Sequence, residues 1–267
     1  MSQAESDDAP RGNPKYVVPA LDKGLDILEL LSDTAVSMSQ VDIARALGRN
    51  VSEIFRTLSA LEARGYIRRS PAGQYRLTLK LFELSRTHSP YEEMLRVALP
   101  IMRDLSDELN ETCHLTTLRG GEIVVLAQNE APKPIRLSIE VGSRHSPLLT
   151  TSGRILLAAM DEATRLAFLT NYTDFAELSA ERQASFLERV GEVGRRGYEI
   201  AEDERFMGGL DIGALVGSPA STTKAALIVA TLQGRQAPPD KQRISEAVLA
   251  ASAAITRALG LVGANPA

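Results

Sequence analysis

Cysteine, histidine and tryptophan are scarce in this chain of 267 residues, which has one cysteine, three histidines and no tryptophan. One cysteine cannot form an internal disulfide, and one cysteine with three scattered histidines makes a zinc site improbable. No apolar run approaches the roughly 20 residues that a helix needs to span a bilayer. The N-terminus, MSQAESDDAP, also lacks the basic and apolar regions of a secretory signal. We therefore expect a cytoplasmic protein with no metal, no cofactor and no membrane partner.

The charge of the chain is unevenly distributed. The net charge of -4 argues at first against nucleic acid as a partner. Residues 45–80, however, hold eight basic and two acidic residues, a local net charge of +6, so the remainder sums to -10. Such segregation indicates a nucleic-acid-binding segment joined to an acidic body, although a solvated helical face would give the same count.

Three short stretches near the N-terminus have the apolar periodicity of helices. They cover residues 21–31, 39–47 and 51–64, and each repeats apolar residues at the spacing of one helical face. Only residues 48–50 separate the second stretch from the third, which is typical of the tight turn in a helix-turn-helix. The residues expected to be buried are Leu21, Leu25, Leu28, Val41, Ala44, Leu47, Val51, Ile54, Phe55, Leu58 and Leu61.

A basic hairpin follows the third stretch and completes a predicted winged helix-turn-helix. Residues 66–69 and 74–77 have strand-like sequences, and Ser70-Pro71-Ala72-Gly73 forms the turn between them. We place this DNA-binding domain at residues 16–80, after a disordered tail of residues 1–15 and before a linker helix region at residues 81–92.

The polar face of the third helix and the hairpin supply the candidate DNA contacts. Arginine in a major groove can pair with guanine, so Arg56 is assigned to base edges, whereas hydroxyls and wing arginines suit phosphates, to which Ser52 is assigned. Any one arginine could be merely exposed; the joint pattern is more specific. The full candidate set is Arg49, Ser52, Glu53, Arg56, Ser59, Arg68, Arg69 and Arg76.

These segments resemble the DNA-binding domain of the IclR family of bacterial transcriptional regulators. The likeness lies in VPALDKGLDILELL, IARALG, SEIFRTLSALEARGYIRR and YRL, and it continues to the C-terminus. The resemblance implies double-stranded operator DNA and a small-molecule effector as partners, RNA polymerase as a further contact, and a homodimer or homotetramer. Glu53 departs from the small hydroxyl residue common in the family; it can read cytosine, pair with a neighbouring arginine or tilt the helix.

The pattern changes beyond residue 111, after helical stretches at residues 80–86 and 91–111. Short strand-like runs and helical stretches then follow in an order that predicts an α+β domain with a largely antiparallel sheet, residues 93–267. The resemblance implies a GAF-like domain that binds the effector and supports oligomerisation. Strands are expected at residues 112–118, 123–127, 135–139, 198–201, 211–216 and 225–232, and helices at 153–160, 162–169, 180–195 and 239–259.

No residues in this domain form a legible catalytic cluster, so we predict a protein that is not an enzyme. Cys113 and His114 are neighbours on a predicted strand and point to opposite faces, which favours structural packing for both. A nucleophile elbow at Ser152 would need a glycine where Thr150 stands. Two alternatives stay open: an enzyme with an appended DNA-binding module, and an architectural DNA-binding protein whose body has no cavity.

Two segments resemble the walls of the family's effector pocket. LLTTSGRILLA matches a loop and helix N-terminus whose N–H groups and hydroxyls suit a carboxylate, although an ordinary helix cap has the same composition. ERFMGGLDI matches a strand entering the pocket, and on this alignment apolar residues replace polar ones of members that bind small acids. We therefore expect an effector larger or more apolar than a two- or three-carbon acid, such as an aromatic or alicyclic catabolite. The candidate residues are Thr150, Thr151, Ser152, Gly153, Ala201, Asp211, Ile212, Ile228 and Ala230.

Overall fold

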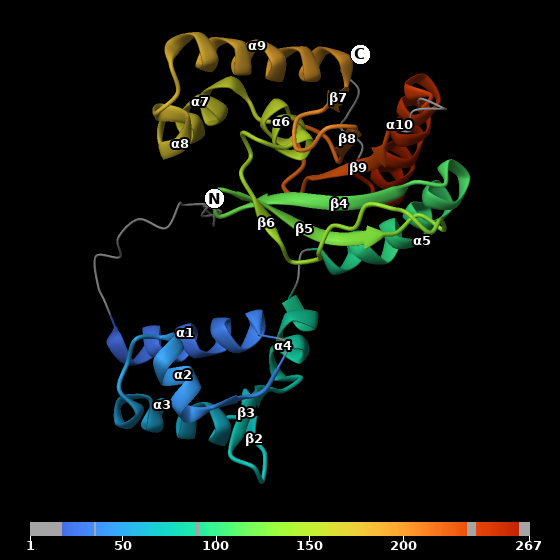
Figure 1. Ribbon diagram of the computed structural model, residues 1–267. Helices are drawn as coiled ribbons and strands as arrows, with labels where there is room; N and C mark the ends of the chain where they lie inside the picture. Colours follow the sequence, from blue (N-terminus) through green and yellow to red (C-terminus); the bar gives the residue numbers. More distant parts are fainter. Residues whose placement is uncertain (1–17, 35, 89–90, 234–238, 262–267) are drawn as a thin grey trace. The chain divides into compact units, whose positions relative to one another are not determined.

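The chain folds into two compact units, which are described separately. The computed structural model describes residues 18–34, 36–88, 91–233 and 239–261 (Figure 1). The contacts divide the chain between residues 89 and 90. Residues 80–88, part of which we expected in a linker, therefore group with the N-terminal unit. No helix in the described ranges is long and apolar enough to cross a membrane.

The described part of the N-terminal unit has four helices and a small antiparallel sheet in the order β1-β3-β2. The side chain of Ser39 accepts a hydrogen bond from the Asp42 N–H and caps the second helix. The helices enclose a core that includes Ile27, Ile43 and Ile54. The elements are α1 (Pro19–Asp33), β1 (Met38–Ser39), α2 (Gln40–Ala46), α3 (Val51–Ala63), β2 (Ile67–Arg69), β3 (Gln74–Leu77) and α4 (Lys80–His88).

The buried face of α1 differs from the one we predicted. Leu21 and Leu25 are 57% and 46% exposed, whereas Gly24, Ile27 and Leu31 are buried. Gly24 lies where α1 approaches α3 closely, because a side-chain carbon there would lie 3.8 Å from Thr57. The leucine stripe is therefore rotated away from the core. The other exceptions are Val41, Val51 and Phe55, which are exposed, and Leu28, Leu47 and Leu61, which are half-buried, while Ala44, Ile54 and Leu58 are buried as expected.

The C-terminal unit is an antiparallel sheet with helices on both faces, which confirms the predicted α+β class (Figure 1). The strand order is β6-β5-β4-β9-β8-β7, and α5 and α10 pack on one face while α6 and α9 pack on the other. The elements are α5 (Glu92–Leu109), β4 (Thr112–Arg119), β5 (Glu122–Asn129), β6 (Arg144–His145), α6 (Thr151–Ala158), α7 (Glu162–Thr170), α8 (Thr173–Ala176), α9 (Ala180–Arg196), β7 (Tyr198–Glu202), β8 (Gly209–Val216), β9 (Ala225–Leu232) and α10 (Lys241–Ala258).

The strand predicted at residues 135–139 is wrong. This segment has no strand assignment, and side chains hold its backbone: Thr112 Oγ1 donates to the Leu137 carbonyl at 2.8 Å, and the Ile139 N–H donates to the Gln128 side chain. Side-chain oxygens thus satisfy the Leu137 carbonyl and the Ile139 N–H in place of the backbone of a neighbouring strand. The segment instead covers one end of a cavity, described below.

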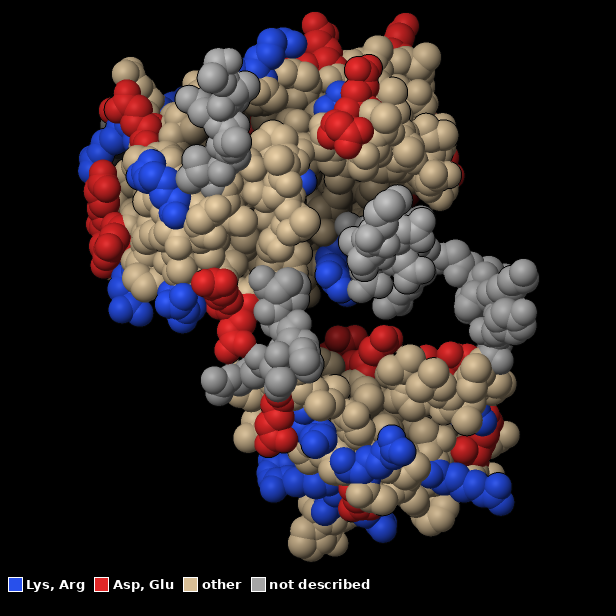
Figure 2. All heavy atoms as spheres, turned by 180° about the vertical axis from the view of Figure 1, so that it is seen from behind, with Lys and Arg blue, Asp and Glu red and all other residues tan. Residues whose placement is uncertain are grey.

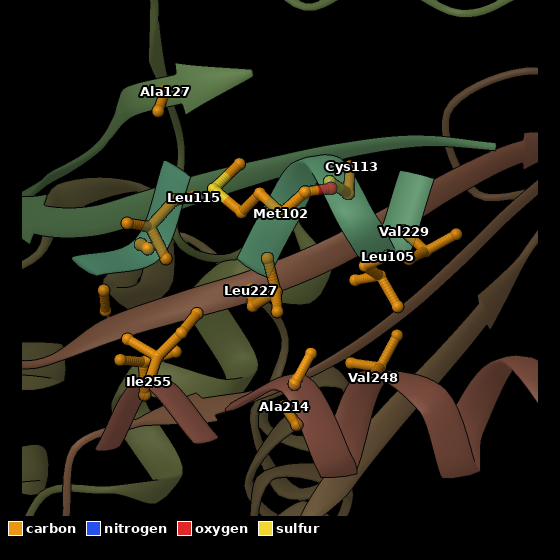
Figure 3. Close-up of a cluster of buried hydrophobic side chains, with 14 of the residues drawn as sticks. Met102, Leu105, Cys113, Leu115, Ala127, Ala214, Leu227, Val229, Val248 and Ile255 are labelled. Carbon is orange, nitrogen blue, oxygen red and sulfur yellow. The ribbon is translucent and has the colours of Figure 1, made fainter. Parts of the chain in front are cut away.

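Strand alternation divides the sheet into an apolar face and a more polar face. Cys113, Ile212 and Val229 point into the core beneath α5 and α10. The Cys113 thiol lies 3.2 Å from the Met102 carbonyl (Figure 3), and burial raises the pKa of this thiol to about 12. Cys113 is therefore a packed, unreactive thiol. The residues next to these in sequence, among them His114, point to the other face.

Candidate functional site

The exposed face of α3 carries the predicted polar residues. Ser52, Arg56 and Ser59 are all exposed and lie at i, i+4 and i+7. The Ser59 hydroxyl donates to the Phe55 carbonyl at 3.0 Å, within the helix. The helix therefore presents one arginine between two hydroxyls along a solvent-facing line.

Glu53 and Arg49 are engaged within the N-terminal unit. The Glu53 carboxylate lies 2.8 Å from Lys23 Nζ and 3.4 Å from Arg49 Nη1, while Arg49 Nη2 lies 2.9 Å from Asp26. The hydrogen bond from Lys23, with further help from Arg49, lowers the pKa of Glu53. Of the three roles considered for Glu53, the structure forms the pairing with an arginine. It adds Lys23, a partner the sequence argument did not name, so this group of charges ties α1 to the start of α3.

The wing places two arginines directly opposite each other. Arg68 on β2 and Arg76 on β3 are paired in the antiparallel register, and both are exposed. The guanidinium of the exposed Arg69 lies 5.6 Å from the centre of the Tyr75 ring. Like charges in a directly opposed pair destabilise a hairpin, so this pair favours a polyanion nearby. Figure 2 shows lysine and arginine side chains gathered toward one end of this unit.

A cavity of about 470 Å³ lies on the polar face of the C-terminal sheet. Its floor is made by strands β4, β5, β8 and β9, one wall by Thr150 and the first turn of α6, and its other walls by the segments 137–145 and 205–206. Polar and apolar groups are mixed in it. The lining residues are His114, Thr116, Ile123, Val125, Leu137, Ser138, Ile139, Glu140, Ser143, His145, Thr150, Thr151, Ser152, Arg205, Phe206, Asp211 and Ala230.

Five of the nine predicted effector residues line this cavity: Thr150, Thr151, Ser152, Asp211 and Ala230. The other four are not among the lining residues. Ile212 packs in the core on the opposite face of the sheet, because it follows Asp211 on a strand. Ile228 packs against α6 with Ile155, Ala201 lies opposite Asp211 on the neighbouring strand, and Gly153 is pressed against Pro147.

The sequence argument missed His114, Arg205 and Phe206 as cavity residues. For His114 a signal existed, because it alternates with Thr112 and Thr116 and so shares a face with two hydroxyl side chains. Arg205 and Phe206 lie in the loop before a strand, where residue periodicity does not predict which way a side chain points.

Burial controls the charges inside the cavity. The Asp211 carboxylate lies 3.4 Å from Thr151 Oγ1, and burial raises its pKa to about 6 against the opposing effect of Arg205. Burial also lowers the pKa of His114 to about 4, with smaller contributions from His145 and Arg205. At neutral pH the cavity therefore holds an uncharged imidazole, an ionised but desolvated carboxylate and the cationic Arg205.

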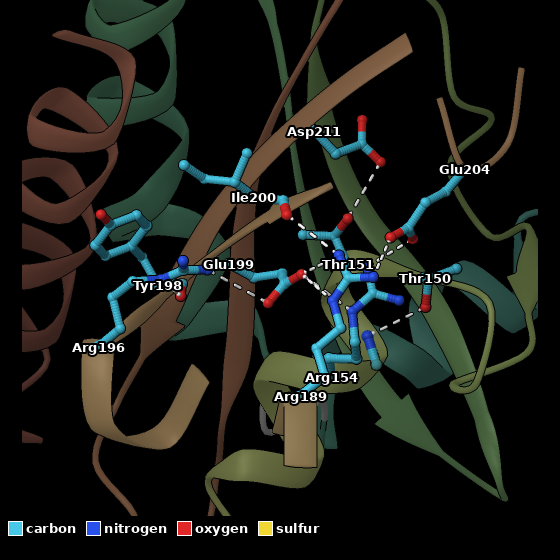
Figure 4. Close-up of polar contacts among 11 residues, drawn as sticks. Thr150, Thr151, Arg154, Arg189, Arg196, Tyr198, Glu199, Ile200, Glu204 and Asp211 are labelled. Atoms are coloured by element: carbon cyan, nitrogen blue, oxygen red, sulfur yellow. Dashed lines mark hydrogen bonds and ion pairs between the residues drawn. The ribbon is translucent and has the colours of Figure 1, made fainter. Parts of the chain in front are cut away.

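Behind the first turn of α6 lies a buried ion network. Arg154 Nε is 3.3 Å from Glu199 and its Nη2 is 2.7 Å from Glu204, while Arg189 contacts the same two acids at 2.6 and 2.5 Å (Figure 4). Arg196 lies 3.6 Å from Glu199 on the outer side. The network joins α6, α9 and β7 to the loop that carries Arg205 and Phe206, and so supports two walls of the cavity.

The raised pKa of Asp211 predicts a specific pH dependence. The native carboxyl holds a proton up to about pH 6, whereas an exposed aspartate releases it near 3.8. The contribution of Asp211 to the free energy of unfolding should therefore fall as pH rises from 4 to 6.5. Relative to Asp211→Asn, which does not titrate, the loss should reach about 2 to 3 kcal/mol. Urea unfolding of both proteins across this range measures it, and a constant difference between them would contradict it.

The N-terminal unit is a helix-turn-helix with a basic wing, and the C-terminal α+β unit contains a ligand-sized cavity. Together they define a class of protein: a DNA-binding transcriptional regulator with a separate ligand-binding domain. Family comparisons agree. A model of the bacterial transcriptional regulator IclR C-terminal domain matches residues 91–257, and an IclR helix-turn-helix domain model matches residues 20–71. The chain belongs to the IclR family.

Curated relatives and solved structures span nearly the same length as this chain. It is 26% identical over 247 residues to the transcriptional regulator XynR of Escherichia coli K12, covering 91% of this chain and 98% of XynR. The repressor AllR of the same organism is 26% identical over 208 residues, covering 74% and 77%. An IclR homolog from Microbacterium hydrocarbonoxydans, solved with 4-hydroxybenzoate, superposes with a TM-score of 0.75 at 21% identity and 90% and 99% coverage.

These comparisons confirm three predictions: the family, the fold class and a regulator in place of an enzyme. XynR and AllR are named as a transcriptional regulator and a transcriptional repressor. At 21% identity, the similarity to the Microbacterium structure supports the fold alone.

Proposed function

We propose that this chain is an operator-binding transcriptional regulator whose DNA affinity is controlled by a small molecule in the 470 Å³ cavity. The single observation that carries the DNA-binding half is the wing, where Arg68 and Arg76 oppose each other on exposed strands. This arrangement is unfavourable alone and favourable against phosphates. The exposed line of Ser52, Arg56 and Ser59 then supplies a face for the major groove.

The test of this function is selection of bound fragments from genomic DNA, with and without a pool of metabolites. A regulator of this kind enriches a few fragments that share a sequence, and a metabolite changes their recovery. An architectural protein would enrich fragments without a shared site, and no metabolite would alter recovery. The cavity favours the first outcome, because an architectural protein needs no ligand-sized cavity.

Arg56→Ala and Arg68→Ala are expected to weaken DNA binding in different ways. Losing Arg56 should cost about 1 to 3 kcal/mol on the selected site and little on scrambled DNA, because a base contact carries sequence preference. Losing Arg68 should weaken both DNAs alike and lower the salt slope by about one, because a phosphate contact releases a counterion. Fluorescence anisotropy at several salt concentrations measures both. Equal losses on both DNAs for Arg56→Ala would place that residue away from the bases.

The cavity favours a ring-sized acid as effector. Its volume lies within the range of small-molecule sites, and Ile123, Val125, Leu137 and Phe206 give it apolar walls. Arg205 and the N–H groups at the start of α6 suit a carboxylate. The Microbacterium relative holds 4-hydroxybenzoate. We therefore assign an aromatic or alicyclic acid to this chain; stronger stabilisation by glyoxylate than by benzoate or cyclohexanecarboxylate in thermal-shift assays would overturn this.

A homodimer fits the exposed apolar residues of the N-terminal unit. Leu21 and Leu25 on α1 and Leu81 and Leu84 on α4 are exposed, although they repeat at helical spacings typical of buried faces. A single helix-turn-helix reads only a few base pairs, so two copies on a palindromic or repeated operator give the needed specificity. Pairing through the C-terminal units would then make a tetramer. The molar mass of the free protein in solution distinguishes these states.

A further inference from the structure

Phe55 is an exposed aromatic residue on α3. It is 51% exposed, whereas its neighbour Ile54 is fully buried in the core of the N-terminal unit. Within the described ranges, no other aromatic ring and no cation stacks on the Phe55 ring. The side chain therefore presents apolar surface that the single chain leaves uncovered.

Phe55 shares its face of α3 with the polar residues assigned to DNA. Ser52 lies three residues before it and Ser59 four residues after it, so the three side chains are neighbours on one helical face. Arg56 borders this face, and all four residues are exposed. Phe55 also lies in the first half of α3, the part of a recognition helix that reaches base edges in a helix-turn-helix.

The major groove offers this ring one kind of apolar partner. The base edges there present hydrogen-bond donors and acceptors, apart from the C5-methyl group of thymine. Removing apolar surface from water on both sides of a contact is favourable. The exposed Arg56 on α3 and the exposed Arg68 and Arg76 on the wing attract the polyanion to this unit. Docking of α3 in the groove would bury the ring against the bases.

We propose that Phe55 is a specificity-determining residue that packs against the C5-methyl group of a thymine in the operator. This inference rests on the proposed binding of operator DNA through α3. It adds an apolar base contact beside the hydrogen bonds assigned to Arg56. The competing occupant of the Phe55 surface is a second copy of the chain. The basic residues around Phe55 favour DNA, because two copies that met through this face would bring like charges together.

Replacement of thymine by deoxyuridine tests the proposal on the site selected from genomic DNA. It removes only the C5-methyl group and keeps the base pair and the O4 acceptor. Each thymine is replaced in turn, and binding is measured by fluorescence anisotropy. At least one replacement should weaken binding of the wild type about 4-fold, the effect of one buried methyl group. Phe55→Ala should bind the thymine site more weakly and should be nearly insensitive to that replacement.

Two further variants control for the loss of an apolar side chain. Phe55→Leu keeps an apolar group on the same face and should keep most of the sensitivity to the methyl group. Val51→Ala removes an exposed apolar side chain one turn earlier on α3, where Val51 is 41% exposed and lies three residues before the buried Ile54. It should keep the sensitivity of the wild type. If Val51→Ala loses this sensitivity and Phe55→Ala retains it, the proposal is wrong.

The unfolding temperature and molar mass of Phe55→Ala test the competing occupant. Alanine is a good helix former, and the replaced side chain is half exposed, so the unfolding temperature should stay close to that of the wild type. The molar mass in solution should also be unchanged. A large fall in the unfolding temperature, or a smaller assembly, would mean that the ring packs within the protein or against a second copy, and would overturn the proposal.

The outcomes distinguish this inference from the proposed function. If no thymine replacement affects the wild type, or if each one affects the wild type and Phe55→Ala equally, the contact with the methyl group is excluded while operator binding stands. Equal weakening of Phe55→Ala on the selected site and on scrambled DNA would place the ring against the DNA backbone and also overturn the proposal. Recovery of no shared site overturns both the role of Phe55 and sequence-specific binding.

Discussion

Gly153→Ala is expected to displace the first turn of α6 and to destabilise the C-terminal unit by about 3 kcal/mol. A side-chain carbon on Gly153 would lie 2.0 Å from the Pro147 carbonyl oxygen and 2.5 Å from its carbonyl carbon. Both are backbone atoms, so no side-chain rotation relieves the overlap. The turn that must move contains Thr150, whose hydroxyl accepts the Gly153 N–H at 3.1 Å. Urea unfolding measures the loss, and titration with benzoate or 4-hydroxybenzoate should detect weakened ligand binding.

Gly191→Ala is the matched control. Gly191 lies within α9, where an added carbon would meet only the flexible Arg195 side chain, at 3.6 Å. Alanine at such a site stabilises a helix by about 0.4 to 1 kcal/mol. If Gly153→Ala has wild-type stability and ligand affinity, the close approach of Pro147 to α6 does not constrain the site.

Gly153 was predicted as an effector contact, but the structure gives it a packing role. The resemblance to family pockets placed it among the effector contacts, yet it lines no part of the cavity. Its lack of a side chain lets the loop before α6 lie against the helix, which brings Thr151 and Ser152 to the cavity wall. The contact between Pro147 and Gly153 depends on the tertiary structure, so no periodicity in the sequence predicts it.

Strand alternation explains which pocket predictions the structure supports and which it does not. Asp211 and Ile212 were both carried over from the resemblance, although neighbours on a strand point to opposite faces. The structure turns Asp211 to the cavity and Ile212 to the core. The same rule separates Cys113 from His114. It places Cys113 in the core and His114 at the cavity.

Helix periodicity identified the helices but not always their buried faces. In α1 the leucines at 21 and 25 form a regular stripe, yet the face that packs is the one through Gly24, where α3 comes close. A stripe of leucines on a helix predicts that this face is buried, but it does not predict which part of the protein or which subunit buries it. A second subunit that covers Leu21 and Leu25 would reconcile the sequence pattern with the exposed side chains of the single chain.

The ion network behind α6 could not be predicted, because its members come from four separate parts of the chain. Glu199 is 2% exposed at its side chain and Arg154 is 4% exposed, so each depends on the other for compensation of a buried charge. Glu204 belongs to the loop before β8 and connects the network to Arg205 and Phe206. The cavity therefore depends on charges that do not line its interior floor.

Arg154→Met should destabilise the C-terminal unit by about 3 to 5 kcal/mol, because it leaves the buried Glu199 with fewer cations and removes one of the two arginines that pair with Glu204. The double variant Arg154→Met, Glu199→Met should recover much of this loss, since it removes both buried charges and keeps the Arg189–Glu204 pair. Urea unfolding of the wild type, both single variants and the double variant gives the coupling. Additive losses would mean that the two charges do not compensate each other. Strong coupling would show that Arg154 and Glu199 compensate each other within the network that joins the first turn of α6 to the 203–208 loop.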